Sequence, residues 1–262
     1  MSEYRYVERP FLDQLAALGW VVIDQGDGVP LDPAASLRTD FREVVIKAEF
    51  FAALDALNRQ PDGRSWLTDA QKEDLYEEIS GVRLATGKSL LEVNEAILKL
   101  LFKMQVDRNE VTGEEYPTVT LIDFENPERN RFLAINQYRI DTPGRTRDHV
   151  RPDIVLFVNG MPLVVVECKD ANEFTSNPMY ECFLQLMRYS NQRPETKAAG
   201  LREGDERLFF TNQLLIRTCG EKADYGSITS TDEEYFFVWR DIYPEANRRY
   251  TPPLGKERAQ EK

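Results

Sequence analysis

Histidine is almost absent from this sequence, since His149 is the single one among 262 residues. Nucleophilic triads, histidine-rich zinc sites and histidine-dependent nuclease sites would all have to use this residue. His149 lies in the polar stretch RTRDHVRPD, which favours a solvated loop. We therefore expect any enzymatic chemistry of this protein to depend on carboxylates and lysine.

Cysteines and long apolar runs are also scarce. The three cysteines, Cys168, Cys182 and Cys219, are odd in number and lack CxxC spacing, which argues against a disulfide framework or a structural zinc site. The apolar runs fall well short of the roughly 20 residues that span a bilayer. The first residues, MSEYRYVERP, carry no signal-peptide pattern. We expect a cytoplasmic protein with free thiols and no membrane contact.

Basic residues are outnumbered, because 33 Lys and Arg stand against 45 Asp and Glu and give a net charge of −12. Strong autonomous binding to nucleic acid needs a broad basic surface from which counterions are released, and this balance excludes one. Any DNA contact is expected to be local or assisted by another domain. With 42% hydrophobic residues, the chain can bury the core of one large domain or two modest ones.

Helices are predicted in the first part of the chain. A helix at 6–18 ends just before Gly19, a residue type that often follows a helix. From about 39 to 105 the apolar residues keep a helical period. Three pairs in this region have capping-box spacing, namely Asp40 with Glu43, Thr68 with Gln71, and Ser89 with Glu92.

Short apolar or alternating runs predict strands elsewhere, and a further helix is expected to begin at Asn177-Pro178. The predicted strands are 20–23, 119–124, 131–138, 154–158, 163–169, 207–211, 214–218 and 235–239. We therefore predict an α/β fold in which helices flank a mixed sheet. The polar residues 252–262, which begin with Pro, are typical of a linker.

The clearest group of chemistry-bearing residues lies in RPDIVLFVNGMPLVVVECKD. Asp153 begins one strand, Glu167 and Lys169 end the next, and Asn159-Gly160 forms a hairpin turn between them. A plain two-residue turn would place Asp153 opposite Val166. We therefore predict a bulge or a longer loop that brings Asp153 opposite Glu167. Strand alternation then places Glu167 and Lys169 on one face of the sheet.

Two carboxylates and an amine at one end of a sheet suit phosphodiester hydrolysis. The carboxylates and a main-chain carbonyl would bind Mg²⁺, a hard cation that prefers oxygen and lowers the pKa of bound water. Lys169 would orient that water or help to deprotonate it. A solvated cross-strand salt bridge explains the same residues, so the spacing alone leaves both interpretations open.

The following helix supports a site, because Gln185 and Tyr189 are four residues apart and share one face. Ordinary flanking polar residues remain the alternative. Cys168 is expected to point into the core and not to act as a nucleophile. Four arginines near the group are candidates for phosphate contacts, or else belong to solvated loops: Arg145, Arg147, Arg151 and Arg188.

The segment GVRLATGKS, residues 81–89, approximates a phosphate-binding loop. Such a loop has four residues between its glycines and follows a strand, so that backbone amides cradle the phosphates. Here the spacer has five residues and the preceding DLYEEIS is helical. We therefore expect no ATP binding at this segment, and we expect Ser89 to cap the next helix.

These residues resemble the PD-(D/E)xK nucleases, and the helix with Gln185 and Tyr189 resembles the QxxxY helix of RecB-type members. More closely, the chain resembles the N-terminal endonuclease region of the R (HsdR) subunit of type I restriction-modification enzymes. The resemblance covers most of residues 4–240 and is most specific at 150–190. The segments that carry it are VERPFLDQLAALGW, NQYRI, RPDIVLFVNGMPLVVVECKD, QLMRYSNQ, LFFTNQLLI and YGSITSTDEEYFFVW.

The resemblance implies a restriction-endonuclease-like domain at 1–250, with a helical insertion at about 39–110 and a linker at 251–262 toward a helicase-like motor. It implies Mg²⁺-dependent cleavage of double-stranded DNA, ATP bound only by the motor, and partner subunits for methylation and specificity. The implied roles are metal binding by Asp153 and Glu167, water orientation by Lys169, supporting contacts by Gln185 and Tyr189, and an extra acidic ligand in Glu8. A capping or surface role for Glu8 remains an alternative.

Two other functions stay open. The first is a catalytically silent docking domain, whose acidic surface would contact the motor and the partner subunits. Mg²⁺-dependent cleavage by the full subunit would exclude it. The second is a stand-alone PD-(D/E)xK nuclease without a motor, which ATPase motifs after Lys262 would exclude.

Overall fold

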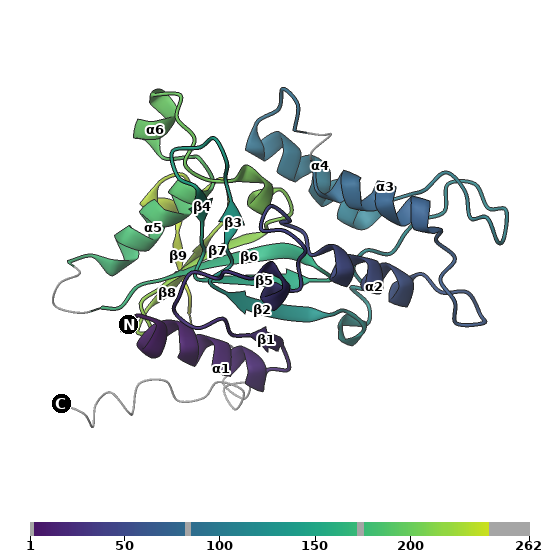
Figure 1. Cartoon of the computed structure of the whole chain (residues 1–262), viewed down its shortest axis with the longest axis horizontal. Coiled ribbons are helices and arrows are strands. Elements are labelled where there is room, and N and C mark those ends of the chain that lie inside the picture. Colours follow the sequence, from purple (N-terminus) through teal and green to yellow (C-terminus); the bar gives the residue numbers. More distant parts are fainter. Residues whose placement is uncertain (1–2, 82–84, 172–175, 241–262) are drawn as a thin grey trace.

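The computed structural model describes residues 3–81, 85–171 and 176–240 and has a mixed β-sheet at its centre (Figure 1). In spatial order the strands are β1 (Val21–Ile23), β2 (Phe132–Asn136), β5 (Ile154–Val158), β6 (Met161–Cys168), β7 (Leu214–Thr218), β8 (Ala223–Gly226) and β9 (Phe237–Val238). The pairs β1–β2 and β6–β7 are parallel, and the other neighbouring strands are antiparallel. A separate two-stranded ribbon consists of β3 (Ile140–Asp141) and β4 (His149–Val150).

Helices flank this sheet, which confirms the predicted α/β fold class. A π-helical turn at Tyr4–Glu8 runs directly into the first α-helix. The α-helices are α1 (Arg9–Ala17), α2 (Lys47–Leu57), α3 (Asp69–Ile79), α4 (Leu90–Lys103), α5 (Pro178–Tyr189) and α6 (Pro194–Ala198). Figure 1 shows α2, α3 and α4 grouped at one end of the molecule, with α1 beside β1.

The two faces of the sheet bury different layers, as strand alternation requires. Leu133 and Ile135 of β2 belong to the larger apolar cluster, together with buried side chains of α2, α3, α4 and α5. Ala134 lies between them in the sequence and packs in the smaller cluster, which contains Leu12 and Leu15 of α1. The helical region therefore packs on one face, and α1 covers the other.

The hairpin of β5 and β6 contains the predicted bulge. The pairs Val158 with Met161 and Phe157 with Pro162 follow the register of a two-residue turn, but Leu156 pairs with Val164. The extra residue is Leu163, next to a proline that has no N–H to donate to the ladder. Ile154 consequently pairs with Val166, and the same register continued by one residue places Asp153 opposite Glu167.

Two of the three predicted capping boxes are present. Thr68 and Gln71 cap α3, and Ser89 and Glu92 cap α4, each with both reciprocal bonds. The prediction of a helix start at Asp40 was wrong. The Glu43 side chain instead accepts a hydrogen bond from the backbone N–H of Lys47 (2.7 Å), where α2 begins.

Two predicted strands were also wrong, and side chains explain both. In 119–124 the backbone of Thr120 is satisfied by the Asn58 side chain, which accepts from its N–H and donates to its C=O. In 207–211 the Asp205 side chain accepts from Arg207 N–H and starts a 3₁₀ turn at Glu206–Phe209. Such side-chain caps give the backbone an alternative to a sheet ladder.

The structure also places the single histidine and the three cysteines. His149 is half-buried in β4 opposite Asp141, and not in the exposed loop expected for it. The three cysteines are free, as predicted, and all three are buried. Among the described residues there is no helix with the length and apolar character needed to cross a membrane. The linker predicted at 251–262 lies outside the described residues.

The turn between β5 and β6 gives a test of the packing against α2. A Cβ atom on Gly160 would lie 2.6 Å from the Ile46 carbonyl oxygen, whereas one on Gly63 meets nothing within 4 Å. Both glycines have a positive φ, which costs an L-residue about 1–2 kcal/mol. We expect Gly160→Ala to lower the free energy of unfolding by about 3 kcal/mol or more, and Gly63→Ala by about 1 kcal/mol. Urea unfolding measures both, and equal losses would contradict the close approach.

Candidate active site

The candidate site lies where β5 begins and β6 ends. Asp153 precedes β5, and its Oδ2 accepts the backbone N–H of Cys168 at 2.7 Å. The Glu167 carboxylate is fully buried, and its Oε1 accepts from Lys169 Nζ (3.2 Å) and Gln185 Nε2 (2.9 Å). The structure therefore brings together Asp153, Glu167, Lys169 and Gln185, which the sequence analysis had grouped.

Lys169 contacts three oxygens at this site. Besides Glu167, its Nζ donates to the Cys168 carbonyl oxygen (2.8 Å) and forms an ion pair with Glu3 (3.2 Å). These are two carboxylates and one main-chain carbonyl, the donor set expected for a hard cation. The ammonium group is thus in direct contact with the oxygen atoms that would hold a metal.

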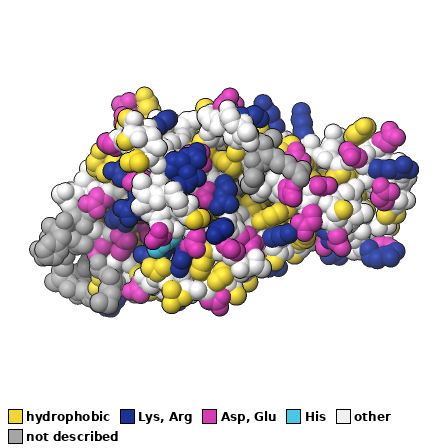
Figure 2. Space-filling view, turned by 45° about the horizontal axis from the view of Figure 1, so that its top comes forward, with side chains coloured by type: hydrophobic (Ala, Val, Ile, Leu, Met, Phe, Trp, Pro, Cys, Tyr) yellow, Lys and Arg dark blue, Asp and Glu magenta, His cyan; other side chains and the backbone are white. Residues whose placement is uncertain are grey.

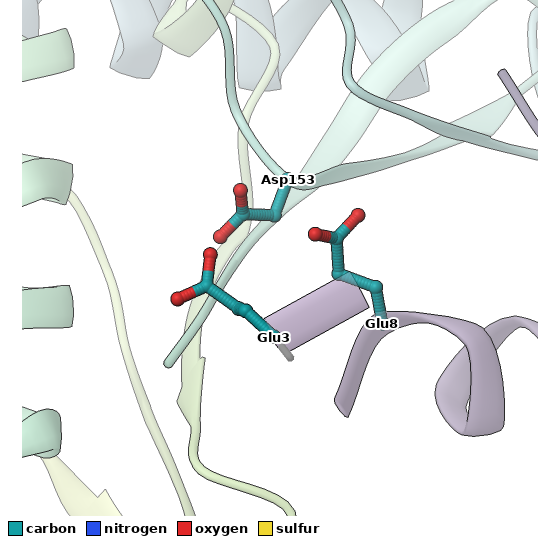
Figure 3. Close-up of side chains that lie close together, drawn as sticks. All are labelled: Glu3, Glu8 and Asp153. Atoms are coloured by element: carbon teal, nitrogen blue, oxygen red, sulfur yellow. The ribbon is translucent and has the colours of Figure 1, made fainter. Parts of the chain in front are cut away.

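The N-terminal helical turn adds further carboxylates. Figure 3 shows Glu3, Glu8 and Asp153 pointing toward one another, and one oxygen from each lies within 4.8 Å of the others. Glu8 is buried, and its Oε2 accepts from Gln137 Nε2 at 2.8 Å and from Asn136 Nδ2 at 3.5 Å. Glu8, which directly precedes α1, therefore faces this site. Because it is buried, it is not a surface residue.

Glu3 was missed by the sequence analysis, for a structural reason. Residues five apart do not share a face of an α-helix, and so Glu3 and Glu8 showed no pattern. The turn at Tyr4–Glu8 is a π-helix, whose hydrogen bonds join residues five apart. The backbone N–H of Arg9 donates to the Tyr4 carbonyl oxygen in this pattern.

The carboxylates at this site are held where their charged forms are disfavoured. Burial and the neighbouring Glu167 raise the pKa of Asp153 well above its usual value, and burial also raises the pKa of Glu167. Burial and the charge of Asp153 raise the pKa of Glu8 to about 8. The surrounding carboxylates outweigh the effect of burial on Lys169 and raise its pKa. Lys169 is therefore a protonated hydrogen-bond donor at neutral pH.

The donor set fits a divalent cation. Glu167 Oε2 is buried and has no hydrogen-bond partner among the described residues. A buried carboxylate oxygen of this kind normally has a partner, because an unsatisfied buried acceptor is costly. A hard cation would satisfy it and would offset the repulsion between the carboxylates. The residues that could hold such an ion are Glu3, Glu8 and Asp153, whose carboxylate oxygens lie within 4.8 Å of one another, and Glu167 is a further candidate through its partnerless Oε2.

Helix α5 carries the supporting residues. Its start is fixed by Asn177, whose side chain accepts the Tyr180 N–H, and by Pro178 at the first position. Gln185 reaches Glu167, while the buried Tyr189 donates its hydroxyl to the Arg151 carbonyl oxygen (3.0 Å). Tyr189 thereby fixes the backbone two residues before Asp153.

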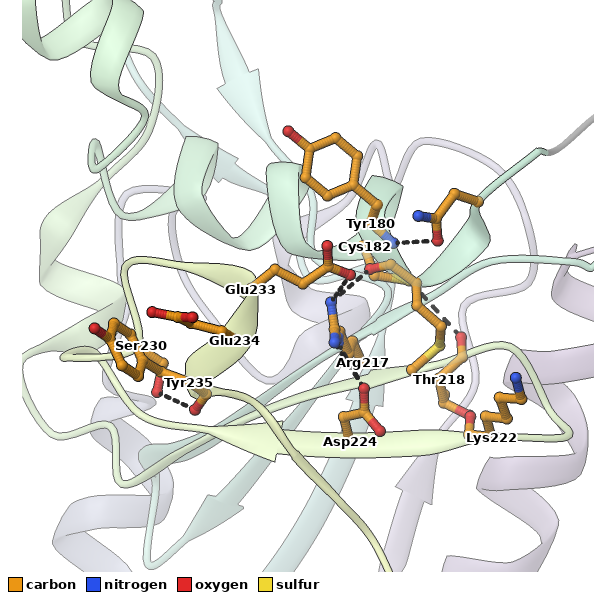
Figure 4. A network of polar contacts seen from close by, with 12 residues as sticks. Tyr180, Cys182, Arg217, Thr218, Lys222, Asp224, Ser230, Glu233, Glu234 and Tyr235 are labelled. Carbon is orange, nitrogen blue, oxygen red and sulfur yellow. Dashed lines mark hydrogen bonds and ion pairs between the residues drawn. The ribbon is translucent and has the colours of Figure 1, made fainter.

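A polar network anchors the start of α5 to the sheet (Figure 4). The buried Arg217 of β7 donates to Asp224 of β8 (2.7 Å) and to Glu233 (2.8 Å). It also donates to the carbonyl oxygen of Met179 in the first turn of α5. Arg217 pairs in register with Glu167 across the parallel strands. The network therefore fixes α5 against the strand that carries Glu167.

The four candidate arginines lie in the loop between β3 and β4, directly after β4, and on α5. Arg145 and Arg147 lie in the loop between β3 and β4, the first half-buried and the second exposed. Arg151 follows β4 and leads toward Asp153, and Arg188 of α5 lies over the Tyr189 ring at 5.1 Å. Their contacts with phosphate stay predictions.

Two further predictions concern Cys168 and the phosphate-loop-like segment at 81–89. Cys168 is fully buried, as predicted, and burial raises the pKa of its thiol well above its usual value, which disfavours the reactive thiolate. The phosphate-loop-like segment follows helix α3, and Ser89 caps α4. Its residues 82–84 lie outside the described residues.

Comparison with known proteins identifies the family. The family model described as "Type I restriction enzyme R protein N terminus" matches residues 1–234. The chain belongs to this family. The sequence-based resemblance is thereby confirmed.

Curated relatives agree with this assignment to the R protein N-terminus. A putative type I restriction enzyme endonuclease subunit of Methanocaldococcus jannaschii is 28% identical over 92% of this chain and 21% of its own length. The HindI endonuclease subunit of Haemophilus influenzae is 30% identical over 90% of this chain and 20% of its own length. The chain thus spans about a fifth of these relatives.

The raised carboxylate pKa values of this R-protein domain predict how its stability depends on pH. The unfolded chain loses the Glu8 proton near pH 4.5, but the folded protein keeps it until about pH 8. The folded state binds more protons between these values, so the free energy of unfolding of the metal-free protein should fall as pH rises. Glu8→Gln should make this decline shallower.

The measurement is urea unfolding in EDTA at several pH values between 5 and 8. Glu95→Gln, on the exposed side of α4, is the control and should leave the wild-type slope unchanged. Equal slopes for the wild type and Glu8→Gln would show that Glu8 titrates as a solvated carboxylate does.

Proposed function

We propose that this chain is the DNA-cleaving module of a type I restriction R subunit and hydrolyses phosphodiester bonds of double-stranded DNA with Mg²⁺. The observation that carries the proposal is the pair of buried carboxylates, Asp153 and Glu167, beside Lys169 at one end of the sheet. Burial disfavours the ionised form of both carboxylates, and such perturbed acids are typical of a functional site rather than of a surface salt bridge.

The residues have distinct proposed roles in a PD-(D/E)xK mechanism. Mg²⁺ bound here would lower the pKa of a coordinated water molecule and neutralise phosphate charge. Asp153, Glu167 and the Cys168 carbonyl hold the ion, with Glu8 as a further acidic ligand. Lys169 orients the attacking water, since its raised pKa makes it a donor and a poor general base. Gln185 and Tyr189 keep Glu167 and the backbone before Asp153 in place.

The proposed setting is a larger cytoplasmic assembly. The relatives are about five times as long as their matched region and are named endonuclease subunits of restriction enzymes. We propose that residues 1–250 form the endonuclease domain, followed by a linker and an ATP-driven motor. Methylation and specificity subunits would select the DNA. The net charge of −12 agrees with DNA that is delivered by a motor rather than captured by this domain.

Substitutions at the site should separate cutting from translocation. In the full-length subunit, Asp153→Ala, Glu167→Ala or Lys169→Ala should reduce DNA cleavage by about a thousandfold or more, because each removes a group in contact with the ion or the water. ATP hydrolysis and translocation should persist. Gln185→Ala and Tyr189→Ala should reduce cleavage by about 10–100-fold, as residues that support the ligands.

Glu95→Ala on α4 is the control and should cut as the wild type does. Loss of ATPase activity together with cleavage would mean that the variants damage the fold and not the chemistry. Full cleavage by the three alanine variants would favour a docking domain without catalytic function, and the proposal would fail.

The chain alone should bind DNA weakly and in a metal-dependent way. The carboxylates repel phosphate until a divalent cation offsets them. We expect weak binding with a shallow salt dependence that improves with Ca²⁺ or Mg²⁺, and Asp153→Asn should remove the improvement. An electrophoretic shift titration with and without Ca²⁺ measures this. Tight binding without metal would contradict this prediction.

A further inference from the structure

A second site of opposite charge lies away from the carboxylates. A pocket of about 300 Å³ opens between the start of α4, the loop from β3 to β4, and the segment around the 3₁₀ turn Glu206–Phe209. It shares no residue with the cluster of Glu3, Glu8 and Asp153. Its charged side chains are Lys88, Arg145, Arg202, Arg207, Asp205 and Glu206.

This pocket carries an excess of positive charge, although the whole chain is negatively charged. Four cationic side chains face two carboxylates, an excess of two positive charges, in a protein of net charge −12. Figure 2, turned so that the top of Figure 1 comes forward, shows Lys and Arg side chains on this face of the molecule, interspersed with Asp and Glu side chains. A local positive excess in an acidic protein is where an anion would bind.

Two of the cations are fixed by the two acids. Arg207 donates to Asp205 from Nε (3.0 Å) and Nη2 (2.5 Å), and Asp205 itself caps the 3₁₀ turn. Arg202 forms an ion pair with Glu206 at 3.3 Å. These pairs hold the guanidinium groups in place, and the remaining N–H donors of each fork are available to a ligand.

The other two cations have no such partner. Within residues 3–81, 85–171 and 176–240, neither Lys88 nor Arg145 forms an ion pair. The loop that carries Arg145 is tied to the same wall, since Thr146 N–H donates to the Arg202 carbonyl oxygen (3.1 Å). Among the described residues the pocket thus presents two cations without an ion pair, although the charge of Lys88 also helps to lower the pKa of the nearby Glu92.

The remaining lining suits a small oxyanion. Leu90, Val93 and Phe210 supply apolar walls, which strengthen the attraction between a bound anion and the cations. Thr86 supplies a hydroxyl group. A volume of about 300 Å³ is at the lower end of the range for ligand sites, which suits one phosphate-bearing group.

We propose that this pocket binds phosphate oxygens, carried either by the DNA backbone or by a small phosphate compound. Lys88 and Arg145 are the main anion ligands, with Arg202 and Arg207 as fixed neighbours. The segment GVRLATGKS therefore contributes Thr86 and Lys88 to an anion site that is not a nucleotide-binding loop. The proposal does not depend on the chain being a nuclease.

The test uses the whole chain and the double variant Lys88→Gln/Arg145→Gln. Its control, Lys99→Gln/Arg59→Gln, removes the same charge at exposed positions outside the pocket. Inorganic phosphate and pyrophosphate are titrated calorimetrically in EDTA, and a fluorescent DNA duplex is titrated by anisotropy. We expect pyrophosphate to bind the wild type and the control equally, and to bind the pocket variant about tenfold more weakly or worse.

The DNA arm distinguishes the two sources of phosphate. If pyrophosphate competes with the duplex and the pocket variant loses affinity for both, the DNA backbone is the ligand. If only pyrophosphate binding falls, the ligand is a small phosphate compound. Absent pyrophosphate binding in the wild type, or an equal loss in pocket and control variants, would overturn the proposal.

A further variant separates this site from the proposed nuclease. Asp153→Asn should remove the Ca²⁺ effect on DNA binding but leave pyrophosphate binding in EDTA unchanged. The pocket variant should keep the Ca²⁺-induced improvement in DNA binding while losing pyrophosphate. If Asp153→Asn abolished pyrophosphate binding in EDTA, the anion would reside at the carboxylate site, and the pocket proposal would fail.

Discussion

The burial of negative charge at the meeting point of β5 and β6 is the constraint on which the rest of the site depends. Glu167 is fully buried and Asp153 nearly so; burial raises the pKa of both, and the charge of Glu167 raises that of Asp153 further. Isolated buried charges are costly, so proteins pair them or neutralise them. Here Lys169 provides a contacting positive charge, and neutral donors from Gln185 and the Cys168 backbone provide the rest.

The surrounding fold holds this unfavourable group together. The bulge at Leu163 sets the register that brings Asp153 opposite Glu167, and the close contact of Gly160 with α2 fixes the other end of the same hairpin. Helix α5 is fixed at its start by Arg217 and reaches the site through Gln185. Elements far apart in the sequence thus meet on two strands, which gives a rigid rather than an adaptable site.

Local patterns predicted much of this fold, and they failed where side chains replaced backbone pairing. Periodicity and capping residues predicted α3, α4 and α5, and the Asn159-Gly160 turn with its required bulge predicted the hairpin of β5 and β6. The strand expected at 119–124 failed because Asn58, about sixty residues away in the chain, satisfies its backbone. Contacts of this range are invisible to a window of sequence.

The candidate site also contains residues that local sequence predicts and residues that only the fold brings together. Asp153, Glu167 and Lys169 could be predicted because they lie on adjacent strands of one hairpin, where register follows from turn geometry. Glu3 could not, since only a π-helical turn aligns it with Glu8. The basic pocket was also out of reach, because Lys88, Arg145 and Arg202 come from three separate segments and meet only in the folded chain.

The electrostatic arrangement also limits what the chain does alone. Lys169 already contacts Glu167, the Cys168 carbonyl and Glu3, so a divalent cation at these oxygens competes with an internal ammonium group. Protons compete as well, because the raised pKa of Glu8 keeps that carboxyl protonated near neutrality. An ion bound at Glu167 would use Oε2, which has no hydrogen-bond partner among the described residues, so Lys169 could keep its contact with Oε1 while a proton on Glu8 competes with the ion. Under the proposed function, phosphate oxygens of DNA would add to the ligands of such an ion, so metal binding and DNA binding would support each other.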